Sequence, residues 1–281
     1  MNIIKTIGET RKIIKDWKKS GLTVGLVPTM GFLHEGHGSL IARSVKENDR
    51  TVVSVFVNPM QFSLGEDMGV YPRDMERDSR MCQELGADLI FNPEAEEMYT
   101  KSFYSFVDMS VISEGLCGAS RENMFKGVCT VVSKLFNIVT PDRAYFGKKD
   151  AQQLAVVKQM VNDLNIDIKI VGCDCVREAD GLAKSSRNSY LTHGERAVAP
   201  KIYAALLQVK KMVICGEHHS CVLTESFKRS MYDEPMLQTE YAEIVDGLTM
   251  QPVPQVTGQG RCLMAVAVKL GKARLIDNIE I

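Results

Sequence analysis

The sequence predicts an α/β fold in two domains, and three observations carry the prediction. The run TVVSVFV at 51–57 is continuously apolar and rich in β-branched residues, which is typical of a buried parallel strand. The stretch at 24–41 changes from a strand to helical spacing through a glycine-containing turn. Beyond Val176 the strands become short and end in a hairpin. We therefore expect a Rossmann-like parallel sheet over 1–176 and a smaller α+β domain over 177–281.

The first domain should alternate strands with helices, joined by right-handed crossovers. Ile13, Ile14 and Trp17 share one face of an opening helix that Gly21 ends. The expected elements, in order, are a helix at 9–20, a strand at 24–27, a helix from about 35, strands at 51–57 and 87–91 around a helix at 75–85, a half-buried strand at 103–111, a helix at 128–139, a strand at 143–146, a helix from 151 and a strand at 166–176.

The second domain should combine two amphipathic helices with a small sheet. Gly271 and Lys272 join its last two strands as a hairpin. The expected elements are helices at 193–215 and 223–232 and strands at 241–245, 263–270 and 274–279. Ahead of them, the stretch GLAKSSRN at 181–188 gathers hydroxyl, amide and basic side chains, as a mobile loop that clamps phosphate would.

Charge and composition exclude several classes of protein. The formal net charge is −1 over 281 residues, so the overall balance does not point to nucleic acid or to an anionic membrane. The first residues intersperse charges with apolar side chains, so we expect neither a signal peptide nor a membrane span, and a cytoplasmic protein. The eight cysteines are scattered, which favours small buried hydrophobes over a disulfide framework.

Two patterns leave a metal site as an alternative. Cys173 and Cys175 alternate along an expected strand and share a face, but no second pair completes a ligand set, so core packing is favoured. His218, His219 and Cys221 fall in an expected turn where adjacent side chains diverge, which favours a solvated turn.

The central feature is a pair of histidines at the start of a predicted helix. His34 and His37 lie three residues apart, and the free N–H groups and positive end of a helix from Glu35 face the same space. Phosphate suits such a site, and glycines at 31, 36 and 38 would let a bulky ligand approach the backbone. A solvated histidine pair is the alternative. Zinc is disfavoured, because metalloprotease histidines are four apart and no third ligand is evident.

Polar residues at other strand ends should join this site. Asn58 and Gln61 follow the strand at 51–57, and the carboxyl ends of neighbouring parallel strands meet at one edge of a sheet. Their amides suit a ligand with hydroxyl and carboxylate groups, although a plain loop amide is the alternative for Gln61. Lys149 and Asp150 begin another helix after a strand, where lysine meets phosphate as a point charge.

Five motifs in one order give the chain a closer resemblance. PTMGFLHEGHGSLI at 28–41, FVNPMQF at 56–62, YPRD at 71–74, RAYFGKKDAQQLAV at 143–156 and SSRNSYL at 185–191 resemble the pantoate–β-alanine ligase family. This family belongs to the nucleotidylyltransferases with a His-x-Gly-His signature. The resemblance implies a homodimer that uses ATP and Mg²⁺ to condense (R)-pantoate with β-alanine through a pantoyl adenylate, giving pantothenate, AMP and pyrophosphate.

The resemblance also assigns roles to residues. Catalysis falls to His37, as a proton-donating or hydrogen-bonding group, with His34, Lys149 and Arg187. The residues implied for ATP are Met30, Gly31, Phe32, Leu33, His34, Glu35, Gly36, His37, Gly147, Lys148, Lys149, Asp150, Val176, Lys184, Ser185, Ser186 and Arg187. Pantoate is assigned to Gln61, close to the β-alanine site, and to Gln153; Asn58 and Arg121 are added for their side-chain chemistry, and Asp78 is implied as a magnesium-associated carboxylate.

Three positions depart from the family pattern. The family usually has Gly-His-Phe where this chain has Asn123, Met124 and Phe125, so the contact of that histidine is lost or replaced. It commonly has Glu at Lys148 and a hydrophobe at Lys184, so each of these positions carries an additional positive charge.

Two other functions stay open at this point. A different adenylyl- or cytidylyltransferase with the same nucleotide site would release a stable nucleotide product. A non-enzymatic nucleotide-binding module would bind ATP without consuming it. The combination of Gln61 and Gln153 with the phosphate clamp speaks against both.

Overall fold

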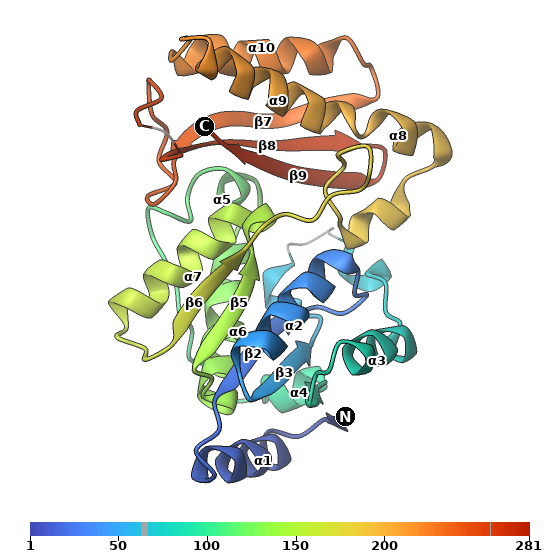
Figure 1. Cartoon of the computed structure of the whole chain (residues 1–281), viewed down its shortest axis with the longest axis vertical. Coiled ribbons are helices and arrows are strands. Elements are labelled where there is room, and N and C mark those ends of the chain that lie inside the picture. The colour runs from blue at the N-terminus through green and yellow to red at the C-terminus, as the bar shows by residue number, and fades with distance from the viewer. Residues whose placement is uncertain (63–66, 259) are drawn as a thin grey trace. The chain divides into compact units, whose positions relative to one another are not determined.

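The computed structural model describes residues 1–62, 67–258 and 260–281, which form two compact units (Figure 1). Unit 1 contains Met1–Met109, Arg121–Lys148 and Val156–Asp174, and unit 2 contains Ser110–Ser120, Lys149–Ala155 and Cys175–Ile281. The last change of unit falls beside Val176. Unit 2 also includes two segments that the sequence assigned to the first domain, 110–120 and 149–155. Hydrogen bonds of Gln152 join these two segments to one another.

Within the described residues, unit 1 is built on a six-stranded sheet whose neighbouring strands are all parallel (Figure 1). In the order β1-β4-β3-β2-β5-β6, its strands are β1 (Asn2–Ile4), β4 (Leu89–Phe91), β3 (Arg50–Val55), β2 (Val24–Thr29), β5 (Arg143–Gly147) and β6 (Lys169–Cys173). The two apolar runs β2 and β3 lie side by side at its centre. The predicted α/β class is confirmed. The edge strand β1 was not predicted, since three residues are too few to show a period.

Helices cover this sheet. α2 (Glu35–Glu47) and α3 (Met75–Glu84) share a core with the strands, in which Ile41 and Cys82 pack with Val27 and Val53. α1 (Ile7–Lys19) and α6 (Met124–Val139) pack against one another and against β2. The shorter elements are α4 (Ala95–Met98) and the 3₁₀ turns η1 (Pro59–Gln61) and η2 (Asp67–Val70), and α7 (Ala151–Asp163) begins in unit 2 and ends in unit 1.

Unit 2 has, among its described residues, a three-stranded antiparallel sheet of β7 (Leu237–Asp246), β8 (Cys262–Leu270) and β9 (Ala273–Glu280). α9 (Lys201–Ile214) and α10 (Ser220–Tyr232) pack against this sheet around Leu206, Phe227 and Val266. The shorter elements are α5 (Cys117–Ser120), α8 (His193–Val198) and η4 (Ser186–Tyr190), with η3 (Lys148–Asp150) at the boundary between the units. The predicted smaller α+β part is confirmed.

Two predictions of secondary structure are wrong. Segment 103–111 alternates polar and apolar residues, yet it pairs with no strand among the described residues, and Tyr104 is 81% exposed. Alternation alone supplies no strand partner. The single helix predicted at 193–215 is two helices, because Pro200 has no N–H to continue the hydrogen bonding of α8.

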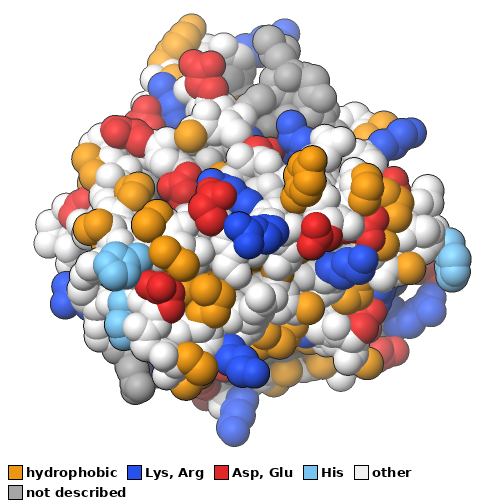
Figure 2. Space-filling model, turned by 90° about the horizontal axis from the view of Figure 1, so that it is seen from above, with side chains coloured by type: hydrophobic (Ala, Val, Ile, Leu, Met, Phe, Trp, Pro, Cys, Tyr) orange, Lys and Arg blue, Asp and Glu red, His pale blue; other side chains and the backbone are white. Residues whose placement is uncertain are grey.

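The helices, the charged side chains and the cysteines can be compared with what the composition predicted. Across the described ranges, every helix is too short or too polar to cross a membrane. On the face drawn in Figure 2, acidic and basic side chains are interspersed. All eight cysteines carry free thiols, and Cys173 is buried in the core of unit 1, which confirms its predicted packing role. Cys175 lies beyond β6 and is half-buried, and Cys215 and Cys221 are exposed, so the prediction of buried cysteines is wrong at these last two positions.

Candidate active site

The predicted histidine pair caps the helix that follows β2. α2 begins at Glu35, as predicted, and His34 is its N-cap. Nδ1 of His34 accepts the Gly36 N–H at 3.1 Å, and Nδ1 of His37 accepts the His34 N–H at 3.3 Å. The two ring centroids are 4.1 Å apart, and the rings are tilted by 37°. Both imidazoles therefore lie at the positive end of the helix.

These two hydrogen bonds fix the tautomer of each ring. A ring nitrogen that accepts an N–H carries no proton, so each neutral imidazole holds its proton on Nε2. An Nε2–H is a donor, and donors at a helix N-terminus suit an anion such as phosphate. The structure corrects one expectation, because His34 itself takes the Gly36 N–H that was predicted for the ligand.

A buried carboxylate lies against the turn before the histidines. Asp78 of α3 is 1% exposed, and it accepts the N–H groups of Phe32 at 2.8 Å and Leu33 at 2.7 Å. Burial raises the pKa of Asp78, and these two hydrogen bonds oppose the shift. Gly31 has a φ of 82°, and a Cβ there would lie 3.0 Å from Asp78 Oδ2. Gly31 thus has a packing role that the sequence did not reveal, while the magnesium role of Asp78 stays a prediction.

Asn58 and Gln61 lie after β3, beside the same turn. Nε2 of Gln61 is 2.9 Å from the sulfur of Met30, so the ends of β2 and β3 meet as predicted. Asn58 is 1% exposed, and its Nδ2 donates to Gln61 Oε1 at 3.1 Å and to the Gly127 carbonyl at 3.0 Å. Its Oδ1 accepts the Tyr99 hydroxyl at 2.7 Å. Asn58 therefore orients Gln61 from within unit 1.

The sequence analysis missed two residues of this region. Burial raises the pKa of Tyr99, so its hydroxyl stays protonated and donates to Asn58. A Cβ at Gly127 would overlap the carbonyl of Met60, so this glycine lets α6 approach η1. A glycine inside an apolar helical pattern was the available signal for Gly127, whereas nothing local marks Tyr99.

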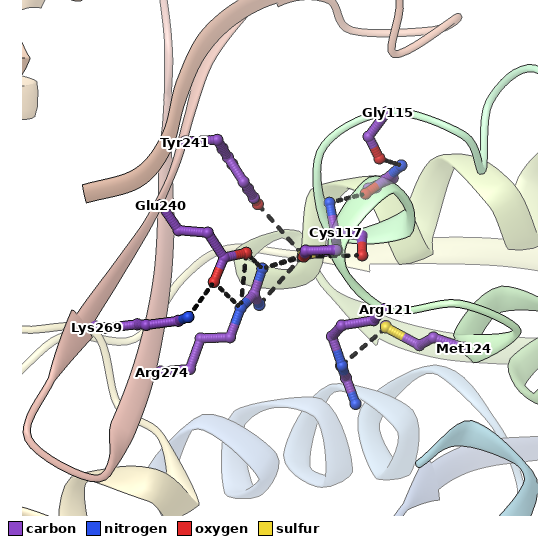
Figure 3. Close-up of polar contacts among 10 residues, drawn as sticks. Gly115, Cys117, Arg121, Met124, Glu240, Tyr241, Lys269 and Arg274 are labelled. Carbon is purple, nitrogen blue, oxygen red and sulfur yellow. Dashed lines mark hydrogen bonds and ion pairs between the residues drawn. The ribbon is translucent and has the colours of Figure 1, made fainter. Parts of the chain in front are cut away.

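Met124, one of the positions that depart from the family pattern, lies against Arg121 (Figure 3). Nη1 of Arg121 lies 2.8 Å from the sulfur of Met124, and Nη2 donates to the Gln61 carbonyl at 3.2 Å. Asn123 precedes α6 with a φ of 62°, the left-handed conformation that Gly and Asn adopt most readily. Asn123, which stands where the family usually has glycine, therefore adopts a backbone conformation that glycine also adopts readily. Met124, which stands where the family usually has histidine, contacts the guanidinium of Arg121.

The ends of β5 and β6 carry an ion pair that the sequence analysis missed. Nζ of Lys148 lies 2.7 Å from Asp174 Oδ1, and this hydrogen bond lowers the pKa of Asp174. The additional positive charge expected at Lys148 is therefore paired within unit 1.

Two neighbouring glutamines at the start of α7 differ in their surroundings. Gln152 is 6% exposed; its Oε1 accepts the Cys117 N–H at 3.0 Å, and its Nε2 donates to the carbonyls of Ile112 at 2.9 Å and Gly115 at 2.8 Å. Gln152 therefore joins two parts of unit 2. Gln153 is half-buried and stays the residue predicted for pantoate.

A second polar cluster of unit 2 surrounds Cys117 (Figure 3). Arg274 forms an ion pair with Glu240 at 2.7 Å, and its Nη1 lies 3.5 Å from the Cys117 sulfur. The Tyr241 hydroxyl lies 3.2 Å from the same sulfur. These groups satisfy one another and join 110–120 to the sheet of unit 2.

The predicted phosphate clamp is a short 3₁₀ segment of unit 2. Ser185 caps η4 and accepts the Arg187 N–H at 3.3 Å. The Lys184 N–H donates to the Val176 carbonyl at 2.9 Å. Lys184 and Val176 were both predicted to bind ATP, and this hydrogen bond brings them together although they lie eight positions apart in the sequence.

The predicted site residues divide between the units. Unit 1 holds 30–37, Asn58, Gln61, Asp78, Arg121, Gly147 and Lys148, and unit 2 holds Lys149, Asp150, Gln153, Val176 and 184–187. Within unit 2, Lys149 Nζ lies 3.5 Å from Asp150 Oδ1. The roles of these residues stay predictions.

The order of these features along the chain matches one known family. The family model for pantoate-beta-alanine ligase matches residues 2–280. The chain belongs to the pantoate-beta-alanine ligase family. The pantothenate synthetase of Ruminiclostridium cellulolyticum is 56% identical over 280 residues, covering 100% of this chain and 99% of the relative. That of Enterococcus faecalis is 54% identical over 278 residues, covering 99% and 98%.

Solved structures of this ligase family share the fold. The pantothenate synthetase of Thermus thermophilus has a TM-score of 0.93 and 43% identity, covering 100% of this chain and 99% of that one. The Francisella tularensis pantoate-beta-alanine ligase, complexed with "beta-gamma ATP" and β-alanine, has a TM-score of 0.81 and 32% identity, covering 100% and 97%. The resemblance inferred from the five motifs is confirmed.

Proposed function

We propose that this protein catalyses the ATP-dependent condensation of (R)-pantoate with β-alanine, giving pantothenate, AMP and pyrophosphate. The observation that carries the proposal is the histidine-capped start of α2 beside the Met30–Gln61 contact, in a chain that matches the ligase family over residues 2–280. Relatives named pantothenate synthetase support the product. The Francisella tularensis complex supports ATP and β-alanine as substrates.

The first step joins pantoate to AMP. A carboxylate oxygen of pantoate attacks the α-phosphorus of ATP, and the bond from that phosphorus to the bridging oxygen breaks, releasing pyrophosphate. Negative charge builds on phosphate oxygens, so positioned donors matter more than a protein nucleophile. We assign this work to the Nε2–H donors of His34 and His37, with His37 as the main catalytic group. The further donors assigned to phosphate are Lys149, Ser185, Ser186 and Arg187.

The second step forms the amide. The amine of β-alanine attacks the acyl carbon of pantoyl adenylate, the bond from that carbon to the phosphate oxygen breaks, and the amine loses a proton as AMP leaves. Gln61 and Gln153 hold pantoate in this account, and Arg121 meets a substrate carboxylate. Asn58 acts through Gln61, because its amide is already engaged inside unit 1.

Magnesium would bind at this site together with the ATP phosphates. Among the described residues, no group of three or more His, Cys, Asp or Glu side chains could hold a metal ion by itself. Mg²⁺ commonly binds through substrate phosphates and water with one or two carboxylates. When bound, it neutralises charge on the triphosphate.

We propose further that residues 177–281 act as a lid domain that carries the clamp of 184–187 to the phosphates. The hydrogen bond from Lys184 to Val176 supports this role, because it fixes the base of the clamp. We place the protein in the cytoplasm, where its eight thiols stay reduced.

We also propose a homodimer whose contact surface is segment 103–109 of unit 1. This segment pairs with no described strand, and the side chains of Tyr104 and Phe106 are 81% and 49% exposed. Exposed aromatic side chains on a segment outside the sheet suit a second copy of the chain. Light scattering of a Tyr104→Ser, Phe106→Ser double variant should report a smaller mass than that of the wild type, and an unchanged dimer would reject this surface.

The experiment that tests the proposed function is mass spectrometry of reactions that omit one component at a time. With ATP, Mg²⁺, pantoate and β-alanine, we expect pantothenate and AMP, and without β-alanine we expect pantoyl adenylate. A stable nucleotide product would point to a different nucleotidyltransferase. ATP binding without turnover would point to a binding module.

A further inference from the structure

Three consecutive backbone N–H groups ahead of α2 are each bound by a side chain. Phe32 N–H and Leu33 N–H donate to the two oxygens of Asp78, and His34 N–H donates to His37 Nδ1. The bonds to Asp78 are 2.8 and 2.7 Å long and join residues 46 and 45 positions apart. Asp78 therefore holds the two residues that lead directly into the N-cap.

The turn would not keep this shape on its own. Gly31 and Phe32 have φ values of 82° and 50°, and the left-handed conformation is unfavourable for a side chain as bulky as Phe. Such strain persists only where surrounding contacts outweigh it, and it is frequent at functional sites. The carboxylate of Asp78 supplies contacts of that kind. Arg77 adds another, since its guanidinium carbon lies 5.0 Å from the centroid of the Phe32 ring.

The surroundings of Asp78 fit an anchor better than a metal ligand. The residue is 1% exposed, and each oxygen already accepts a backbone N–H. Mg²⁺ demands near-octahedral geometry and usually keeps several waters. A carboxylate sealed against the turn leaves little room for such a hydration shell.

We propose that Asp78 is a positioning residue for adenylation, whose carboxylate holds Phe32 and Leu33 so that the imidazoles of His34 and His37 present Nε2–H to phosphate oxygens. The adenylation part rests on the proposed function. The anchoring itself is a property of the protein without substrates. Asp78 touches no reacting atom and acts through the turn.

The first experiment measures the anchor by NMR amide exchange without substrates. Asp78→Asn keeps the size of the side chain but replaces one acceptor oxygen by an NH₂ group, so exchange at Phe32 and Leu33 should become at least about tenfold faster. Asp74→Ala is the matched control, because it removes the N-cap of the same helix, which accepts the Arg77 N–H. It should leave exchange at both sites unchanged. Wild-type exchange in Asp78→Asn would overturn the proposal.

The second experiment measures single-turnover formation of pantoyl adenylate. Asp78→Asn should slow this step by about 30-fold or more, with the half-saturating ATP concentration changed by less than about threefold. The half-saturating Mg²⁺ concentration should stay at the wild-type value. An increase of about tenfold or more in that concentration would identify a metal ligand and reject the positioning role.

A second variant keeps the proposal testable if Asp78→Asn does not fold. Gly31→Ala places a methyl group 3.0 Å from both Asp78 Oδ2 and Val55 Cγ1 at a φ of 82°, which displaces the turn while the carboxylate is retained. We expect fast exchange, slow adenylation and unchanged Mg²⁺ dependence. Fast exchange with wild-type adenylation would overturn the proposal. A wild-type protein that makes no pantoyl adenylate would reject the proposed function, while the exchange experiment still tests the anchor.

Discussion

The turn at 30–34 and the loop at 177–190 both serve phosphate in the proposed function, yet different forces hold them. In unit 1, neutral backbone N–H groups donate to the buried carboxylate of Asp78. In unit 2, ion pairs hold the loop, and the most buried of them joins Arg177 to Asp277 at 2.6 Å. The turn is held by uncharged N–H donors on one buried carboxylate, and the loop is held by pairs of opposite charges.

The loop of unit 2 also depends on half-exposed charges. Arg196 pairs with Glu178 and Asp180 at 2.7 Å each, and salt and water screen pairs of this exposure. The histidine turn is therefore held by one buried carboxylate, whereas the loop of unit 2 combines one buried ion pair with two half-exposed ones.

Removing a histidine from the fixed turn should have the largest effect. His37→Ala deletes the donor that the proposed function assigns to phosphate, so adenylation should fall by about 10²–10³-fold while the protein stays folded. Stopped-flow measurement of pantoyl adenylate checks the rate, and thermal unfolding checks the fold. His193→Ala, at an exposed histidine of α8, is the matched control. Unchanged turnover in His37→Ala would remove His37 from the mechanism.

Breaking the buried ion pair should give the next largest effect. Arg177→Ala leaves Asp277, whose side chain is 6% exposed, without its partner and removes a guanidinium 3.6 Å from the Tyr203 ring centroid. We expect a loss of about 3 kcal/mol in the free energy of unfolding, measured with urea. Arg196→Ala, with half-exposed partners, should lose less than about 1 kcal/mol. Equal losses in the two variants would contradict the contrast within the loop.

The left-handed residue Asn123 offers a smaller test within unit 1. Its φ of 62° suits Asn or Gly, so Asn123→Ala should cost about 1 kcal/mol of stability. Asn123→Gly should be nearly neutral, because glycine adopts the same conformation without strain. Urea unfolding of both variants separates the outcomes. An alanine variant as stable as the glycine variant would show that backbone strain is not what selects Asn123.

The smallest expected effect is a difference between the pKa of Asp78 in unit 1 and the pKa of Asp180 in unit 2. Burial raises the pKa of Asp78, so its charge costs stability above the unfolded pKa, and the cost is relieved as pH falls through the raised folded value. The hydrogen bond from Arg196 lowers the pKa of Asp180, which contributes stability above its unfolded pKa and loses it as pH falls through the lowered value. Carbon-13 NMR should place Asp78 above and Asp180 below the ordinary midpoint of about 3.9. A pKa of Asp78 below that of Asp180 would contradict the contrast between the buried carboxylate and the ion-paired one.

The sequence predicted most of the parallel sheet because buried strands and amphipathic helices carry periods that are visible within one element. It failed where structure depends on distant partners. Segment 103–111 has the alternation of a strand and no described partner, while β1 has too little pattern but pairs with β4. The break at Pro200 was visible in the sequence, but the helical period on both sides concealed it.

The predicted site shows the same division. The pattern at His34 and His37 predicted a helix start, because helix capping involves residues that are only three or four positions apart. The ion pair between Lys148 and Asp174 could not be predicted, because these residues are far apart in the sequence and meet only where the ends of β5 and β6 lie side by side. The sequence also could not show that Gln152 holds the 112–117 backbone while its neighbour Gln153 does not.

By itself the sequence determined the α/β class, the histidine-capped helix, the polar strand ends and, through five ordered motifs, the ligase family. These features come from periodicity and local capping, which act over a few residues. Only the tertiary structure decided which carboxylate holds the turn at 32–33, which charge Lys148 meets and which amide orients Gln61. Each of the first two contacts closes a long loop of chain, and the third depends on the approach of α6 to η1 that Gly127 allows, so no local pattern records them.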